Sequence, residues 1–178
     1  MKRLSEQEQS ARFELAVVPH LDAAYNLARW LTRNDHDAED VVQEAFLRAL
    51  RFFGGFRGGD ARAWLLKIVR NTCYTWLHQN RAKQPDTVFD EEVHVPESAG
   101  DNPETLVLRG ADERLVRQAL EELPDQFREA MVLRELEGLS YKEIAEVAGI
   151  SIGTVMSRLS RARLRMEKAL AGHMRKEH

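Results

Sequence analysis

Residues 139–159, LSYKEIAEVAGISIGTVMSRL, carry the most specific pattern in this 178-residue chain. Ser140 precedes Glu143 by three residues, which is the spacing of a capping box at the start of a helix. Gly149 ends the first apolar run, where the chain has to reverse and a positive φ favours glycine. Ser151 then opens a second apolar run. This order predicts a helix-turn-helix, with a purely structural helical hairpin as the alternative.

The second of these helices carries a row of hydroxyl and cationic side chains. Arginine forms bidentate hydrogen bonds to guanine edges, and serine, threonine and arginine bind phosphates. In a helix-turn-helix, the first half of the second helix faces the bases. We therefore expect four residues on a DNA-facing side: Thr154, Ser157, Arg158 and Arg161. Further along, Arg163 and Arg165 either pair with acids or lie in solvent.

Apolar residues at helical spacing fill most of the remaining chain and predict an all-α protein. Pro19 should kink or restart a helix, Asn34 should cap the next one, and Asp60 should cap a third. Between them, residues 54–59 read GGFRGG and predict a loop. One helix should bury a stripe of seven residues: Ala38, Val41, Val42, Ala45, Phe46, Ala49 and Leu50.

The charges of the chain are separated into blocks, although the net charge is only −3. Residues 51–84 carry 7 basic groups and 1 acidic group, and residues 126–178 carry 10 basic and 7 acidic groups. Residues 85–125, which lie between them, carry 3 basic and 12 acidic groups. Such asymmetry indicates a nucleic-acid partner, although charged runs also serve simply as solvated surfaces.

Helical periodicity disappears after residue 84, where prolines and acids accumulate. We expect two small helical domains, residues 1–84 and 112–178, joined by an acidic linker over residues 85–111. Its carboxylates include Asp86, Asp90, Glu91, Glu92, Glu97, Asp101 and Glu104. They either imitate the charge of a nucleic-acid backbone or merely keep a tether in solution.

Other functional classes find little support in the sequence. Cys73 is the single cysteine, so an internal disulfide and a Cys-based zinc cluster are excluded. The six histidines lack paired metal-ligand spacing, and no phosphate-cradling or nucleophile motif occurs. We expect no enzyme activity, no metal and no cofactor. Without a signal peptide or an apolar run of about 20 residues, we expect a cytoplasmic protein with no membrane insertion.

Taken together, the two halves resemble the extracytoplasmic-function class of bacterial RNA polymerase sigma factors. The matching stretches are DAEDVVQEAFLRAL at 37–50, AWLLKIVRN at 63–71, Leu123-Pro124, and the helix-turn-helix with Gly153-Thr154-Val155 and Ser157-Arg158-Leu159. Met156 and Ser160 depart from relatives, which often have a basic or larger residue there. The resemblance implies a protein that binds core RNA polymerase, recognises −10 and −35 promoter elements, and is held inactive by an anti-sigma factor.

The resemblance also assigns roles to residues. The segment at 37–50 corresponds to the core-polymerase-binding helix, and its polar side carries Asp40, Gln43, Glu44 and Arg48. Recognition and melting of the −10 element fall to the loop and the third helix, with Phe56, Arg57, Arg62, Lys67, Arg70, Asn71, Tyr74 and His78. In that family the loop captures a flipped base, although Phe56 fits a core plug equally well. The linker would thread the channel that RNA later uses.

Two other functions fit the same residues. A one-component helix-turn-helix regulator would sense a ligand with its N-terminal domain. A sigma mimic would bind polymerase without reading DNA.

Overall fold

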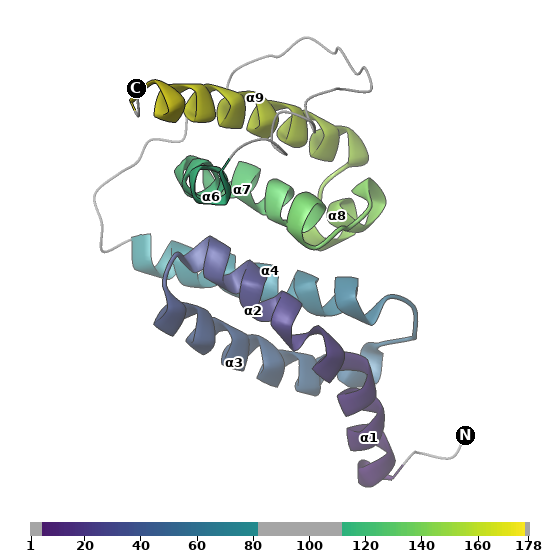
Figure 1. Ribbon diagram of the computed structural model, residues 1–178. Helices are drawn as coiled ribbons and strands as arrows, with labels where there is room; N and C mark the ends of the chain where they lie inside the picture. The colour runs from purple at the N-terminus through teal and green to yellow at the C-terminus, as the bar shows by residue number, and fades with distance from the viewer. Residues whose placement is uncertain (1–4, 82–111, 177–178) are drawn as a thin grey trace. The chain divides into compact units, whose positions relative to one another are not determined.

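The computed structural model describes residues 5–81 and 112–176, and every regular element in these ranges is a helix. The chain divides into two compact units, an N-terminal one and a C-terminal one (Figure 1). The predicted all-α class is therefore confirmed. The acidic segment 85–111 lies outside the described residues. Within those residues, no helix has the length and apolarity that crossing a membrane requires.

The N-terminal unit is a bundle in which α2, α3 and α4 pack against one another (Figure 1). Its elements are α1 (Glu6–Val17), η1 (Val18–His20), α2 (Leu21–Thr32), α3 (Asp35–Phe52), η2 (Phe53–Gly55) and α4 (Ala61–Arg81). Leu27, Leu31 and Leu66 are among its fully buried side chains. Burial of this apolar surface, at about 25 cal/mol per Å², is the main force that holds the bundle together.

Residues at or next to the first turn of each helix determine where α2, α3 and α4 begin. Pro19 lies in the short 3₁₀ turn between α1 and α2, so the predicted restart is confirmed. Asn34 caps α3 by accepting a hydrogen bond from the Asp37 backbone N–H at 3.1 Å. Asp60 accepts one from the Ala63 N–H at 3.1 Å. Each cap satisfies an N–H that a helix start otherwise leaves without a partner.

One part of the predicted α3 stripe is wrong. Ala38, Val41, Ala45 and Ala49 are buried, but Leu50 is 50% exposed. At 100° per residue, the seven residues of the predicted stripe span about half of the helix circumference. That is wider than the side of α3 that α2 and α4 cover. Leu50 lies at the margin of that surface and faces outward.

The C-terminal unit consists of α6 (Glu113–Glu122), α7 (Asp125–Met131), η3 (Val132–Leu136), α8 (Tyr141–Ala148) and α9 (Ile152–Lys176). Helices α6 and α7 both pack on the long α9. The five-residue η3 is a π-helix that continues α7. Its wide turn is closed by the Glu137 N–H, which donates to the Val132 carbonyl at 3.0 Å.

Arg128 of α7 joins the turn between α6 and α7 from the inside. Its side chain is fully buried, and it pairs with Asp125 at 3.1 Å. The guanidinium also donates to the carbonyls of Leu120 and Glu121, both at 3.1 Å, and to the carbonyl of Leu123. Those carbonyls lie at the end of α6 and in the turn after it, where the helix itself supplies few donors, and the Leu120 carbonyl also accepts from the Leu123 N–H at 3.2 Å. Arg128 therefore adds several hydrogen bonds to this turn at once.

We expect Arg128→Ala to destabilise the C-terminal unit by about 3 kcal/mol or more. The substitution removes the arginine partner of the nearly buried Asp125 carboxylate and one donor from each of three carbonyls, and loss of one partner of a buried pair costs about 3–5 kcal/mol. Hydrogen exchange of the α7 and α9 amides measures the effect. Arg117→Ala is the matched control, because Arg117 is exposed and lies 3.8 Å from Glu113. Equal protection in both variants would contradict this role of Arg128.

Candidate functional site

The helix-turn-helix contains the capping residues and the glycine turn from which it was predicted. The Ser140 N–H donates to the Glu143 carboxylate at 2.7 Å, and the Glu143 N–H donates to the Ser140 hydroxyl at 3.2 Å. Gly149 has φ = 67°, and the following N–H of Ile150 donates to the Ala145 carbonyl at 3.1 Å. Ser151 accepts from the Thr154 N–H at 3.1 Å and caps α9. The capping box, the turn and the second cap are thus all confirmed.

Helix α9 separates its apolar side from its polar side along its whole length. Val155, Leu159, Ala162, Met166 and Leu170 are buried. Ser157 is exposed, whereas Thr154, Arg158 and Arg161 are half-buried. All four predicted DNA-facing residues therefore have accessible surface in the first three turns of α9.

Thr154 differs from the other three residues. Its hydroxyl lies 2.9 Å from the Ser151 hydroxyl. Because this contact belongs to the helix cap, the Thr154 side chain helps to fix the start of α9.

The two later arginines of α9 have partners within the unit. Arg163 pairs with Glu135 of η3 at 3.3 Å. The Arg165 guanidinium lies over the Phe127 ring of α7, 5.1 Å from its centroid, which is a cation–π contact. These contacts attach α9 to the helices behind it. Of the two alternatives open for Arg163, pairing with an acid is the one observed.

The outer side of α3 forms a second polar surface, made of residues from three successive turns. Asp40, Gln43 and Glu44 are exposed, as expected. Arg48 is held more tightly, because it donates to Glu44 at 3.0 Å and to the Thr72 hydroxyl of α4 at 3.4 Å. The surface therefore has exposed acidic groups that are accessible to a partner, and a cation positioned by two neighbouring helices.

Sequence reasoning missed an apolar part of this surface. Leu47 is 60% exposed and lies near the centre of the outward side of α3, between the polar residues. A single leucine in an otherwise polar face can be recognised from its position in the helical repeat. Exposed apolar surface ringed by charges is typical of protein–protein contacts.

The outer side of α4 forms a third polar surface. Lys67, Asn71 and His78 are exposed, and Arg62, Arg70 and Tyr74 are half-buried. All six lie on α4: at 100° per residue, Lys67, Arg70, Asn71, Tyr74 and His78 fall within about a third of the helix circumference, whereas Arg62 lies on the side opposite Asn71. The described residues contain no group of His, Cys, Asp and Glu side chains that could hold a metal ion.

Phe56, from the glycine-rich loop before α4, belongs to a cluster of aromatic rings. Its ring stacks on Phe53 with centroids 5.6 Å apart and lies 5.1 Å from Trp64. Phe13 of α1 meets Phe53 edge to face at 5.3 Å. Arg57, the next residue, is exposed. This packing supports the core-plug alternative for Phe56.

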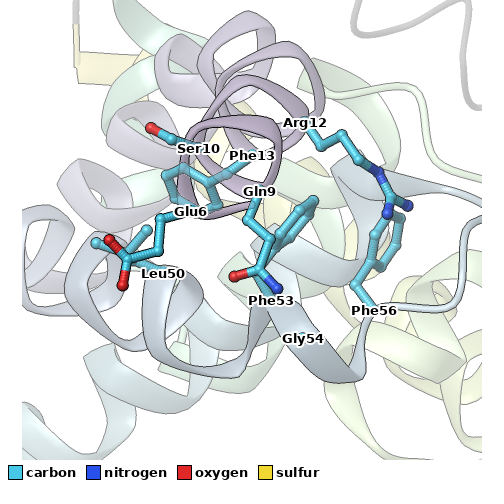
Figure 2. Close-up of a pocket in the computed structure, with 9 residues that line it drawn as sticks. All are labelled: Glu6, Gln9, Ser10, Arg12, Phe13, Leu50, Phe53, Gly54 and Phe56. Atoms are coloured by element: carbon cyan, nitrogen blue, oxygen red, sulfur yellow. The ribbon is translucent and has the colours of Figure 1, made fainter. Parts of the chain in front are cut away.

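A pocket of about 300 Å³ opens beside this cluster, between α1 and the end of α3. Figure 2 shows Phe13, Phe53 and Phe56 at its walls with Leu50 at one side and the polar Glu6, Gln9 and Arg12 at its rim. The exposed Leu50 therefore borders a hollow whose walls are aromatic.

Comparisons with protein-family models match both units. The model described as Sigma-70 region 2 matches residues 16–83, and the model described as Sigma-70, region 4 matches residues 113–166.

Known proteins are similar over almost the whole chain. RNA polymerase sigma-H factor of Pseudomonas aeruginosa is 38% identical over 165 residues, which are 89% of this chain and 86% of the relative. ECF RNA polymerase sigma-E factor of Escherichia coli K12 is 38% identical over 171 residues, which are 92% and 88% of the two chains.

Solved structures of sigma factors are also similar to this chain. The sigma factor RpoE of Bartonella quintana, crystallised with the anti-sigma factor NepR, has a TM-score of 0.69 at 31% identity and covers 90% of this chain and 97% of its own. CnrH, in complex with the cytosolic domain of CnrY, has a TM-score of 0.63 at 26% identity, with 92% and 90% covered.

We expect Phe56→Ala to lower the free energy of unfolding of the N-terminal unit by about 2 kcal/mol. A fully buried phenylalanine costs about 3–5 kcal/mol on truncation, and Phe56 is half-buried. Trp30, Trp64 and Trp76 all lie in this unit, so tryptophan fluorescence during urea unfolding follows it. Arg57→Ala, one residue away and exposed, should change stability by less than about 0.5 kcal/mol. Equal midpoints for both variants would exclude a packing role for Phe56.

Proposed function

Because this chain belongs to the extracytoplasmic-function class of RNA polymerase sigma factors, we propose that each of its three polar surfaces serves one step of promoter-specific initiation. The protein is a transcription initiation factor and not an enzyme. It binds core RNA polymerase and directs it to promoter DNA through −10 and −35 elements. The observation that carries this conclusion is identity of 36–38% to sigma factors along both units.

The outer surface of α3 is the proposed site for core polymerase. Asp40, Gln43 and Glu44 offer exposed hydrogen-bonding groups, and Arg48 is oriented by Glu44 and Thr72. Charge complementarity there would set the orientation and the rate of association. Leu47 would add a desolvated apolar centre to the contact.

The outer surface of α4 is the proposed site for the −10 element. Arg57, Arg62 and Lys67 provide positive charge for phosphates, and Asn71, Tyr74 and His78 provide groups that contact bases. Strand opening costs a few kcal/mol for each unstacked base. Aromatic and planar side chains offset part of that cost by stacking with the base. Phe56 supports the loop from within the aromatic cluster.

The exposed side of α9 is the proposed site for the −35 element. Ser157, Arg158 and Arg161 lie in the first turns of the second helix of a helix-turn-helix, the part that enters the major groove. Met156 is 41% exposed in the same region. Apolar side chains contact the thymine methyl group, so Met156 would favour thymine where a cation would favour guanine.

The domain bounds follow from these roles. We assign residues 1–84 to polymerase and −10 binding, residues 85–111 to the acidic linker, and residues 112–178 to −35 binding. The chain acts where polymerase and DNA are, in the cytoplasm. Solved relatives with TM-scores of 0.69 and 0.63 are complexes with the anti-sigma factor NepR and with the cytosolic domain of CnrY. On that basis, an anti-sigma partner would hold this chain inactive until a signal releases it.

Runoff transcription with purified chain, core polymerase and a promoter library tests the function. A sigma factor gives specific transcripts that core polymerase alone does not produce. A ligand-sensing regulator would bind DNA without core polymerase and start no transcript. A sigma mimic would bind core polymerase and still start no transcript.

We expect Arg158→Ala and Arg161→Ala each to weaken −35 recognition by about 1–3 kcal/mol, because each lost bidentate guanine contact costs that much. Competition between promoters with substituted −35 bases measures the loss. Arg175→Ala removes the same charge in the last turn of α9 and should leave promoter choice unchanged. Unaltered promoter choice in both arginine variants would mean that this side of α9 does not read the −35 element.

Charge reversal on α3 should weaken core polymerase binding. Asp40→Lys with Glu44→Lys replaces two exposed carboxylates, so the fold should survive while the partner meets repulsion. Pull-down of core polymerase measures the loss, and circular dichroism checks the fold. Glu14→Lys with Asp22→Lys makes the same charge change on α1 and α2. If a folded α3 variant bound as well as this control, the α3 surface would not be the polymerase site.

A further inference from the structure

Arg70 lies where its guanidinium organises two other residues of α4. The guanidinium carbon is 4.2 Å from the centroid of the Tyr74 ring, one helical turn later. Its Nη1 atom also donates to the Asn71 side-chain oxygen at 3.4 Å. Arg70 and Tyr74 are half-buried, and Asn71 is exposed. Three of the residues assigned to the −10 surface are therefore connected before any DNA binds.

These contacts restrict what each group can offer to a ligand. A guanidinium over an aromatic ring covers one ring face and limits rotation of both side chains. The Asn71 amide oxygen accepts from Arg70, so the amide N–H groups are the ones left to meet the acceptor atoms of a base. A positioned ring and a positioned donor are what an unstacked base requires, since single-strand recognition combines stacking with hydrogen bonds to base edges.

We infer that Arg70 is a positioning residue of the −10 site: it holds Tyr74 and Asn71 in place for an unstacked base and does not grip a phosphate. The inference rests on the proposed function of the α4 surface and assigns Arg70 a different role from that of Lys67. Lys67 is exposed on the same helix and keeps the role of a phosphate contact.

Salt dependence separates the two roles. Each phosphate contact on a single strand contributes about 0.7 to the slope of log affinity against log salt. The holoenzyme is bound to a fork-junction probe whose single-stranded segment carries the −10 element selected in the library assay. Lys67→Met should lower the magnitude of the slope by about 0.7. Arg70→Met should leave the slope unchanged and reduce affinity about two- to fivefold at every salt concentration, as expected for a cation–π pair that is partly accessible to solvent.

A double-mutant cycle tests the coupling. Arg70→Met should cost little in a Tyr74→Leu background, because the ring that it positions is gone. In a Tyr74→Phe background, which retains the ring, Arg70→Met should cost as much as in the wild type. Arg70→Lys should restore less than half of the loss, because an ammonium group lacks the planar fork. Gln79→Ala, an exposed change elsewhere on α4, should be neutral.

Opening of the duplex gives an independent readout. With 2-aminopurine in the −10 element, Arg70→Met should reduce the fluorescence rise that reports base unstacking, whereas Lys67→Met should affect binding and unstacking in parallel. Tryptophan fluorescence confirms that the variants are folded.

Three outcomes would overturn the inference. If Arg70→Met lowers the salt slope as Lys67→Met does and Arg70→Lys restores it, Arg70 is a phosphate contact. If Arg70→Met and Tyr74→Leu are additive, the pair is not coupled. If Lys67→Met also has no effect on slope or affinity, the α4 surface does not bind the −10 element. The assignment of that surface then fails together with the inference, while promoter-specific runoff transcription would still stand.

Discussion

One fully buried arginine fixes the turn between α6 and α7 in the C-terminal unit through an ion pair and several hydrogen bonds. Arg128 carries a charge into a region without solvent, and the structure compensates with Asp125 and three carbonyl oxygens. Helix α7, which carries Arg128, packs on α9, and α9 carries the predicted DNA surface. A different conformation of the α6–α7 turn would therefore shift α9 and with it the surface proposed to meet the major groove. A hydrophobic residue could fill the same space, but it would remove the donors that Arg128 supplies to the Leu120, Glu121 and Leu123 carbonyls.

Positive charge in this protein serves two purposes that composition does not distinguish. The basic block over residues 126–178 contains 10 cations, yet several of them hold the fold together. Arg163 pairs with Glu135, Arg165 covers Phe127, and Arg134 donates to the Leu139 carbonyl at 2.8 Å. The number of basic residues in a segment therefore overstates the cations available to DNA, and only their positions in the structure separate the two groups.

The parts of the fold that the sequence predicts are those set within one helical turn. Asn34, Asp60, Ser140 and Ser151 each accept from the N–H three residues later, so spacing alone identifies them. The same holds for Gly149, whose φ of 67° is a local requirement of the turn.

Features that depend on distant residues could not be read in this way. The contact between Arg48 and Thr72 joins positions 24 residues apart, and the Phe13–Phe53 contact spans 40 residues of chain. The sequence pattern predicts a buried Leu50, which the structure exposes, because its burial depends on how far α2 and α4 reach around α3. Periodicity gives the direction of a helix face but not its width.

The π-helix at Val132–Leu136 has an evolutionary consequence. A π-turn holds one residue more than an α-turn, and it arises naturally when a residue is inserted into a helix. Deletion of one residue there would return the segment to α geometry and rotate the residues on one side by about 100° relative to the other. Met131 and Val132, both buried, lie at this junction. Length variation among descendants of this chain should therefore accumulate elsewhere and avoid this segment.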